Sequence, residues 1–201
     1  MPRPRTDIRS RVLLAARQRF AAAGVDGSSL RSIAADAGTS IGMVYYYFPS
    51  KEALFLGVVE EVYGRLLADL EQTLAAPPDF KGKLLALYTR IAGASALELD
   101  VVRLVAREAL SSSVRLESLA QRFSRGHLPL IFQAVAAGMK NGELRQDLHP
   151  VVLLAATLAL GTLPQFAVRV VGKSLPIPLP SAEQLTRQLA EALLHGIAAS
   201  R

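Results

Sequence analysis

Side chains that can donate hydrogen bonds to an anion gather in one short stretch near the N-terminus. Three consecutive tyrosines, Tyr45, Tyr46 and Tyr47, are followed by Lys51, and Arg31 precedes them. Tyrosine hydroxyls and a lysine ammonium bind phosphate oxygens, whereas an arginine guanidinium can also make a bidentate contact with guanine O6 and N7. These residue types predict a surface that binds a polyanion, with Arg31 as the best candidate for reading a base.

The elements that must position these side chains are two short helices. Apolar residues within 30–37 fall on one helical face, and Gly38 follows where a left-handed helix end is needed. Ser40 can cap a second helix over 40–48, which ends there because Pro49 disfavours helical geometry at the residue before it. Helix, glycine turn and short helix is the helix-turn-helix layout, whose second helix enters the DNA major groove.

With its flanking segments, this stretch resembles the DNA-binding domain of the tetracycline-repressor (TetR) family of bacterial transcription regulators. The matching strings are VLLAARQRFAAAG (12–24), SSLRSIAADAG (28–38), TSIGMVYYYF (39–48) and PSKEAL (49–54). Later in the chain, NGELRQDLHP (141–150) resembles the turn before the last two helices of many members. The resemblance implies an all-α protein of about nine helices, with a three-helix DNA-binding domain over 1–50 and a regulatory and dimerisation domain over 51–201.

The expected DNA-binding residues lie on the recognition helix 40–48 or at helix N-termini. Gly42 lets the backbone approach DNA closely, while Ile41 and Met43 can touch a thymine methyl group. Val44 and Phe48 are expected in the core, together with one of the three tyrosines. A phosphate contact by Lys51 is implied by the resemblance. The complete predicted set is Ser29, Arg31, Thr39, Ser40, Ile41, Gly42, Met43, Tyr45, Tyr46, Tyr47 and Lys51.

Charge is distributed unevenly along the chain. Residues 1–51 hold eight Lys and Arg against three Asp, a net charge of +5, whereas the other 150 residues hold fifteen basic against fourteen acidic side chains. A basic N-terminal quarter is typical of a nucleic-acid-binding segment. Its first arginines, Arg3, Arg5, Arg9 and Arg11, predict either an arm that reaches the minor groove or a tail that adds only non-specific attraction.

Composition narrows the class of protein. Half of the residues are apolar, a fifth are charged and none is cysteine, which argues against disorder and excludes disulfides and thiolate metal sites. No apolar run precedes Val12, so we expect no signal peptide and a cytoplasmic location. The uncharged stretch 151–168 is long enough to span a membrane, but burial in a core or a subunit interface is the favoured interpretation.

The rest of the chain has the apolar spacing of helices. Pro129 is expected to kink or break one of them. A capping box at Ser181–Gln184 is expected to start the last one. The predicted helices are 7–23, one after Ser29, one after Ser40, 51–75, 80–94, 97–111, 114–140, 150–171 and 181–199.

Two further surfaces follow from the resemblance. The last two helices are expected to pair with those of a second subunit, with burial inside one subunit as the alternative; the predicted interface residues are Leu154, Leu158, Gly161, Leu185, Leu189, Ala192, Leu193 and Gly196. A small-molecule effector pocket is also implied. Its candidates are polar or aromatic residues on apolar helices, for each of which ordinary core or surface is the competing interpretation: Tyr88, Arg103, Arg107, Phe123, His127, Phe132 and Phe166.

Other classes of function find little support in the sequence. The histidines His127, His149 and His195 are scattered, and no phosphate-binding or nucleophile motif occurs, so we expect no enzyme activity, no metal and no cofactor. A membrane-surface protein would rest on 151–168 alone. The resemblance favours a repressor that binds a palindromic operator and is released by a small molecule, and the residues do not distinguish it from an activator.

Overall fold

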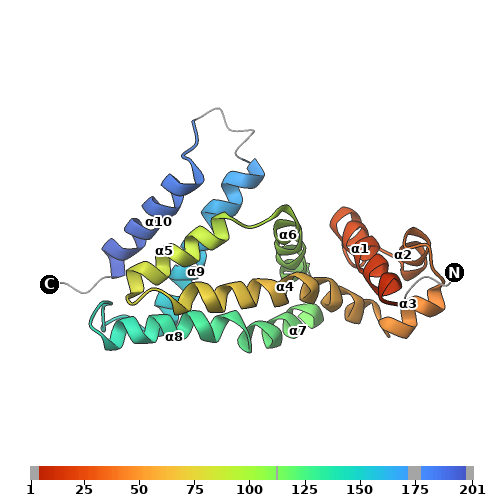
Figure 1. Ribbon diagram of the computed structural model, residues 1–201, viewed down its shortest axis with the longest axis horizontal. Helices are drawn as coiled ribbons and strands as arrows, with labels where there is room; N and C mark the ends of the chain where they lie inside the picture. Colours follow the sequence, from red (N-terminus) through yellow and green to blue (C-terminus); the bar gives the residue numbers. More distant parts are fainter. Residues whose placement is uncertain (1–4, 112, 172–177, 198–201) are drawn as a thin grey trace. The chain divides into compact units, whose positions relative to one another are not determined.

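The computed structural model describes residues 5–111, 113–171 and 178–197, and within these ranges it is built from ten α-helices and no strands (Figure 1). The prediction of an all-α protein is therefore confirmed. The helices are α1 (Arg5–Ala23), α2 (Leu30–Asp36), α3 (Ile41–Tyr47), α4 (Lys51–Ala75), α5 (Phe80–Ala92), α6 (Ala96–Ser111), α7 (Ser113–Ser124), α8 (His127–Lys140), α9 (Pro150–Val171) and α10 (Ala182–Ile197).

The segment predicted as one helix over 114–140 is divided into α7 and α8. The break lies at Gly126, whose φ of −122° and ψ of −113° are not helical. Pro129 therefore falls in the first turn of α8, where backbone N–H groups have no partner inside the helix and a proline costs little. The break therefore lies at Gly126, three residues before the proline, and Pro129 itself occupies a position in the first turn of α8 that a helix tolerates.

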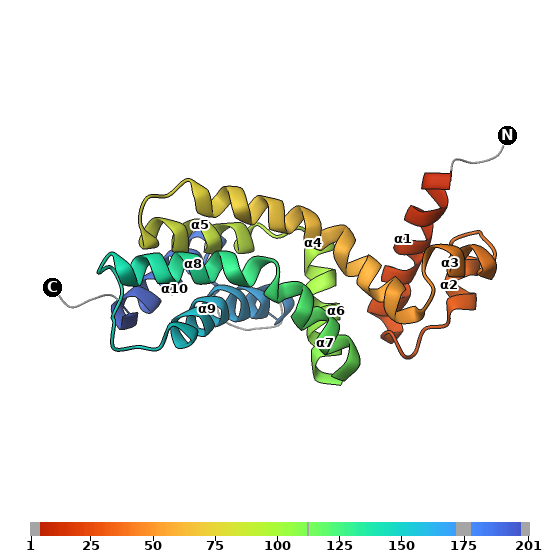
Figure 2. The ribbon, with the colours of Figure 1, turned by 90° about the horizontal axis from the view of Figure 1, so that it is seen from below.

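Contacts divide the chain into two compact units. The first comprises Met1–Leu66 and Ser95–Arg122, so it contains α1 to α3, the start of α4, α6 and most of α7. In this unit α1 packs against α2, α3 and α6. Figure 2 shows α1, α2 and α3 gathered around the beginning of α4. Buried apolar side chains hold this group together, among them Val12, Phe20, Ile33, Val44 and Phe55.

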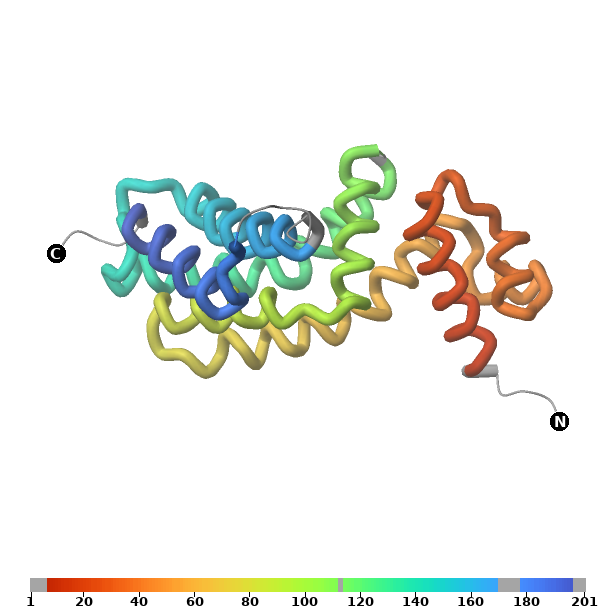
Figure 3. The backbone as a smooth tube through the Cα atoms, turned by 90° about the horizontal axis from the view of Figure 1, so that it is seen from above, coloured from red at the N-terminus to blue at the C-terminus, as the bar shows by residue number. Residues whose placement is uncertain are grey.

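The second unit comprises Leu67–Ala94 and Phe123–Arg201. Here α5 packs against α8, α9 and α10, and α10 packs against α9 (Figure 3). The capping box predicted for the last helix is confirmed, because Ser181 Oγ accepts from Gln184 N–H at 3.1 Å and Gln184 Oε1 accepts from Ser181 N–H at 3.0 Å. Of the proline-rich stretch 175–180 before it, residues 175–177 lie outside the described residues.

Tyr88 of α5 stands at the centre of this second unit. Its side chain is fully buried, and its hydroxyl donates to the Thr157 carbonyl at 3.0 Å. Gln165 Nε2 donates to the Tyr88 carbonyl at 3.1 Å, and Gly161 lies directly against the tyrosine ring. Burial raises the pKa of the Tyr88 hydroxyl, which therefore stays a neutral donor. Tyr88, predicted for an effector pocket, and Gly161, predicted for the dimer surface, thus pack against each other inside one chain, and both site assignments stay predictions.

Gly161→Ala tests this packing. A Cβ at residue 161 would lie 2.5 Å from Tyr88 Cε1, so we expect the free energy of unfolding to fall by about 1–3 kcal/mol. Gly196→Ala is the control, because a Cβ there meets nothing within 4 Å. Chemical denaturation at several protein concentrations measures the effect. A loss that depends on protein concentration would contradict packing within one chain and indicate that Gly161 lies at a subunit interface.

Candidate nucleic-acid interface

Each helix of the predicted helix-turn-helix begins with a serine cap. Ser29 Oγ accepts from Ser32 N–H at 3.0 Å at the start of α2, and Ser40 Oγ accepts from Met43 N–H at 3.3 Å at the start of α3. Between them Gly38 has a φ of +59°, a conformation that side chains with a Cβ rarely adopt. The predicted glycine turn and serine caps are therefore confirmed.

Helix α3 presents one face to the core and another to solvent. Val44 and Phe48 are buried, as predicted. Tyr45 and Tyr46 are 52% and 70% exposed, whereas Tyr47 is half-buried. The ring centroids of Tyr46 and Tyr47 lie 5.0 Å apart. Tyr47 is thus the most covered of the three tyrosines, and the other two can turn their hydroxyls toward a ligand.

The remaining predicted DNA-binding residues are also accessible. Ser29, Arg31, Ser40, Ile41 and Gly42 are exposed, and Thr39, Met43 and Lys51 are half-buried. A Cβ built on Gly42 meets only Ser40 Oγ, at 3.8 Å. The backbone of α3 at Gly42 is therefore open to a partner, and the protein itself leaves space for a side chain there.

Arg9 and Arg11, two of the four arginines for which an arm or a tail is predicted, lie within α1. Arg11 Nη1 donates to the Ala37 carbonyl at 2.6 Å, at the end of α2, and its Nε lies 3.3 Å from the Asp7 carboxylate. Arg9 lies over the Phe48 ring, 5.6 Å from its centroid. These two positions also lie inside the predicted helix 7–23, which is confirmed there, so they form neither an arm nor a tail, and Arg11 holds the turn between α2 and α3. Arg3 and the side chain of Arg5 lie outside the described residues.

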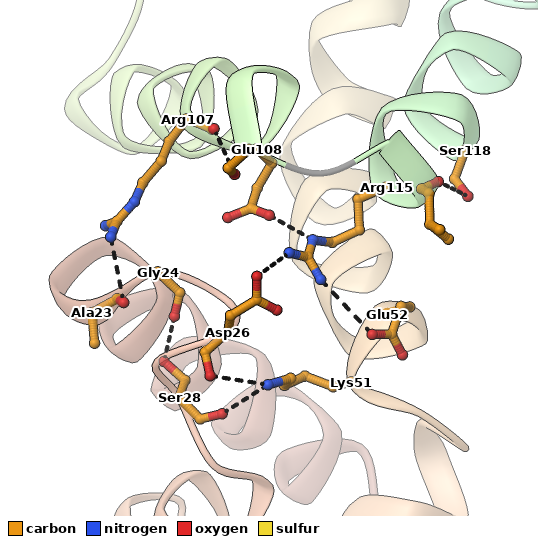
Figure 4. Close-up of polar contacts among 12 residues, drawn as sticks. Ala23, Gly24, Asp26, Ser28, Lys51, Glu52, Arg107, Glu108, Arg115 and Ser118 are labelled. Carbon is orange, nitrogen blue, oxygen red and sulfur yellow. Dashed lines mark hydrogen bonds and ion pairs between the residues drawn. The ribbon is translucent and has the colours of Figure 1, made fainter.

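Lys51, at the start of α4, contacts the loop between α1 and α2. Its Nζ donates to the carbonyls of Asp26 and Ser28, both at 3.3 Å (Figure 4). These bonds hold the loop that leads into the Ser29 cap. A phosphate contact by Lys51 stays a prediction, with the ammonium held close to the first turn of α2.

A cluster of charged side chains in the first unit was not anticipated from the sequence. Arg115 of α7 is almost fully buried and donates from Nε to Glu108 of α6 at 2.5 Å and from Nη2 to Asp26 at 2.7 Å. Its Nη1 lies 3.9 Å from Glu52 of α4 (Figure 4). The hydrogen bond from Arg115 lowers the pKa of the Asp26 carboxyl, so Asp26 is ionised at neutral pH.

One sequence signal pointed to this cluster. Val101, Leu104 and Glu108 follow the i, i+3, i+7 spacing of a single helical face, and all three are buried. A carboxylate on an apolar face needs a cation, because an unpaired buried charge is strongly unfavourable. The signal predicts that a partner exists but not that it is Arg115, which lies on the next helix.

The predicted effector residues are distributed over both units. Arg103 and Arg107 are exposed on α6, where Arg103 pairs with Asp100 and Arg107 donates to the Ala23 carbonyl. The structure brings Phe123 and His127 together, with ring centroids 5.0 Å apart. Phe132 is exposed and Phe166 is half-buried. A shared pocket for these residues stays a prediction.

Helix α9 carries an apolar face that remains exposed in the part of the chain that the structure describes. Val151, Val152 and Leu163 are exposed by more than half, and only 22% of the most apolar stretch in 150–169 is buried. Length and composition alone would let this helix cross a membrane, a test that core helices of soluble proteins also pass. Of the predicted interface residues, Gly161 and Leu193 are buried, Leu154, Leu158, Leu185 and Leu189 are half-buried, and Ala192 and Gly196 are exposed.

Comparison with known proteins gives consistent matches. Residues 12–58 match the family described as bacterial regulatory proteins, tetR family. The fatty acid metabolism regulator protein of Bacillus subtilis (strain 168) is 24% identical over 140 residues, which cover 70% of this chain and 71% of that relative. The transcriptional repressor NicS of Pseudomonas putida is 37% identical over 76 residues, covering 33% of this chain and 36% of its own length.

The fold is also shared with solved structures. The transcriptional regulator FadR from Bacillus subtilis, crystallised in complex with stearoyl-CoA, superposes with a TM-score of 0.74. It is 19% identical in sequence, and the superposition covers 93% of this chain and 98% of that one. At this sequence identity the superposition establishes a common fold and does not identify a ligand of this chain.

Proposed function

Because the chain belongs to the tetR family of bacterial regulatory proteins, which are DNA-binding transcription regulators rather than enzymes, we propose that it is a repressor. In this proposal residues 1–50 bind a palindromic operator and residues 51–201 bind a small-molecule effector and form a homodimer. The main support for this proposal is the pair of serine-capped helices on either side of Gly38. In this arrangement Arg31, Tyr45 and Tyr46 face solvent. A cytoplasmic location accompanies this function.

Selection of bound DNA from a random duplex library tests the proposal. We expect enrichment of an inverted repeat, because two-fold dimers read half-sites related by the same symmetry. Titration of the selected duplex at two salt concentrations then separates base reading from phosphate attraction. Weak, salt-sensitive binding without an enriched sequence would contradict the proposed sequence-specific function.

Arg31 and Lys51 are expected to play different parts in binding. Arg31→Ala should weaken binding to the selected operator by about 1–3 kcal/mol and leave binding to random DNA nearly unchanged, because a bidentate base contact is lost. Lys51→Ala should weaken both and reduce the salt slope by about one, because a phosphate contact is lost. Fluorescence anisotropy on both duplexes measures these changes. Equal losses on the two duplexes for Arg31→Ala would contradict its base-reading role.

Repression, as opposed to activation, is supported by the relatives. NicS is named a repressor, and a regulator that covers promoter DNA needs no additional contact with polymerase. In vitro transcription from a template that carries the selected operator tests this point. We expect less transcript as protein is added, and more transcript would identify an activator.

A long apolar molecule is the effector class we propose. FadR binds stearoyl-CoA, and this chain offers apolar helices in its second unit, where α8 carries no charged residue before Lys140 and α9 none before Arg169. Thermal-shift titration with stearoyl-CoA, with free coenzyme A as the control, tests the class. Stabilisation by the acyl thioester alone is the expected result. Equal responses to both molecules would contradict an apolar effector.

A further inference from the structure

We propose that Arg115 is a positioning residue for DNA binding, which acts on the DNA-binding surface from α7. Its guanidinium holds Asp26, in the loop that joins α1 to α2, at 2.7 Å. That loop ends at Ser29, the cap of α2, and Arg31 lies in the first turn of α2. Fixing the loop therefore fixes the start of the helix that carries the predicted base-reading residue.

Arg115 is held in place by a contact that does not involve the loop. Glu108 is buried and accepts from Arg115 Nε, so the planar guanidinium has one settled orientation. The Asp26 side chain is 74% exposed and has few other constraints. The α6–α7 side of this pair is thus fixed, and it constrains the loop in addition to the two bonds from Lys51.

A second contact joins α6 to the beginning of the same loop. Arg107 Nη2 donates to the Ala23 carbonyl at 3.4 Å, and a Cβ on the adjacent Gly24, whose φ is +77°, would lie 2.9 Å from the Arg107 guanidinium (Figure 4). Arg107 and Arg115 both lie outside residues 12–58, the segment that matches the DNA-binding family. Side chains from α6 and α7 therefore hold both ends of the loop that leads into α2, so that a change in either helix can reach α2.

The substitution Asp26→Asn distinguishes a positioning role from a purely electrostatic one, because the two predict opposite changes in operator affinity. Removing a negative charge from a DNA-binding surface favours DNA through phosphate attraction, so electrostatics alone predicts tighter binding. Loss of the charge-assisted bond to Arg115 frees the loop, so positioning predicts about tenfold weaker binding to the selected operator. The salt slope should stay unchanged, because no phosphate contact is removed.

Asp36→Asn is the matched control. Asp36 lies in α2 of the same unit and pairs with Arg19 of α1, so the charge change is identical while the contact with α6 and α7 remains. Arg115→Lys completes the design: it keeps a cation for Glu108 but loses the fork that also reaches Asp26. We expect Arg115→Lys to weaken operator binding and Asp26→Asn to add nothing in that background.

The inference rests on the proposed DNA binding, so one measurement is made without DNA. Hydrogen exchange of amides 24–30 should be faster in Asp26→Asn than in the natural chain or in Asp36→Asn, by more than any fall in the global free energy of unfolding accounts for. Unchanged exchange, or operator binding as tight as or tighter than that of the natural chain, overturns the positioning role. Absence of any sequence-specific duplex with faster exchange in Asp26→Asn would overturn the proposed function and leave the loop contact established.

Discussion

Replacing Val152 and Leu163 together with glutamate is expected to convert the proposed homodimer into a folded monomer with at least about a hundredfold weaker operator binding, the scale of gain that linking two sites provides. The two residues are 55% and 66% exposed and lie three turns apart on one face of α9. Exposed positions contribute little to the fold of the subunit, so folding should survive the change. Two charges on an apolar face prevent its burial against a second copy.

Light scattering at micromolar concentration measures the oligomeric state, and circular dichroism checks that the helices remain. Leu110→Glu is the control, because Leu110 is 92% exposed on α6 and lies outside the proposed interface. It should remain dimeric and bind the operator normally. A dimer that persists in the Val152 and Leu163 variant would place the subunit interface on another surface.

The helix-turn-helix could be predicted because its determinants are local. Ser29, Gly38, Ser40 and Pro49 each act on backbone within a few residues of themselves, through caps, a left-handed turn and a helix stop. The same local logic found the capping box of the last helix. A feature that is determined by residues within about one helical turn can be predicted from the sequence of those residues alone.

The remaining features depend on contacts between distant segments. Arg115 meets Asp26 from 89 residues away, and the Tyr88 hydroxyl meets the Thr157 carbonyl from 69 residues away. Spacing along one helix shows that a residue lies on an apolar face but not which helix covers that face. For this reason the sequence predicts Gly161 at a subunit interface but does not predict that the ring of Tyr88 lies against it within its own chain.

Arg11 illustrates the same limit over a shorter distance. The basic run at the N-terminus predicts an arm or a tail, whereas the apolar spacing predicts a helix over 7–23 that already includes Arg9 and Arg11. The helix extends back to Arg5, and the guanidinium of Arg11 bonds to the end of α2, 26 residues along the chain. A basic residue whose charge alone predicts attraction to DNA thus supports the turn that positions α3.

Gly42→Leu is expected to stabilise the fold and abolish operator binding. Leucine is a better helix former than glycine by about 0.8 kcal/mol, and residue 42 is exposed with room for a side chain. The melting temperature should therefore rise slightly. In the complex the same side chain would stand between the α3 backbone and the DNA, so that the first turn of α3 cannot approach the groove.

The control for this variant is Gly64→Leu. Gly64 is exposed within α4, and a Cβ there lies 3.7 Å from Glu60 Oε1, so the local gain in helix stability is similar. Its operator affinity should be that of the natural chain. For Gly42→Leu we expect a higher melting temperature by calorimetry and a lower operator affinity by anisotropy. This combination would show that Gly42 serves the approach of α3 to DNA and does not stabilise the fold. Tight operator binding by Gly42→Leu would mean that the first turn of α3 does not face the DNA.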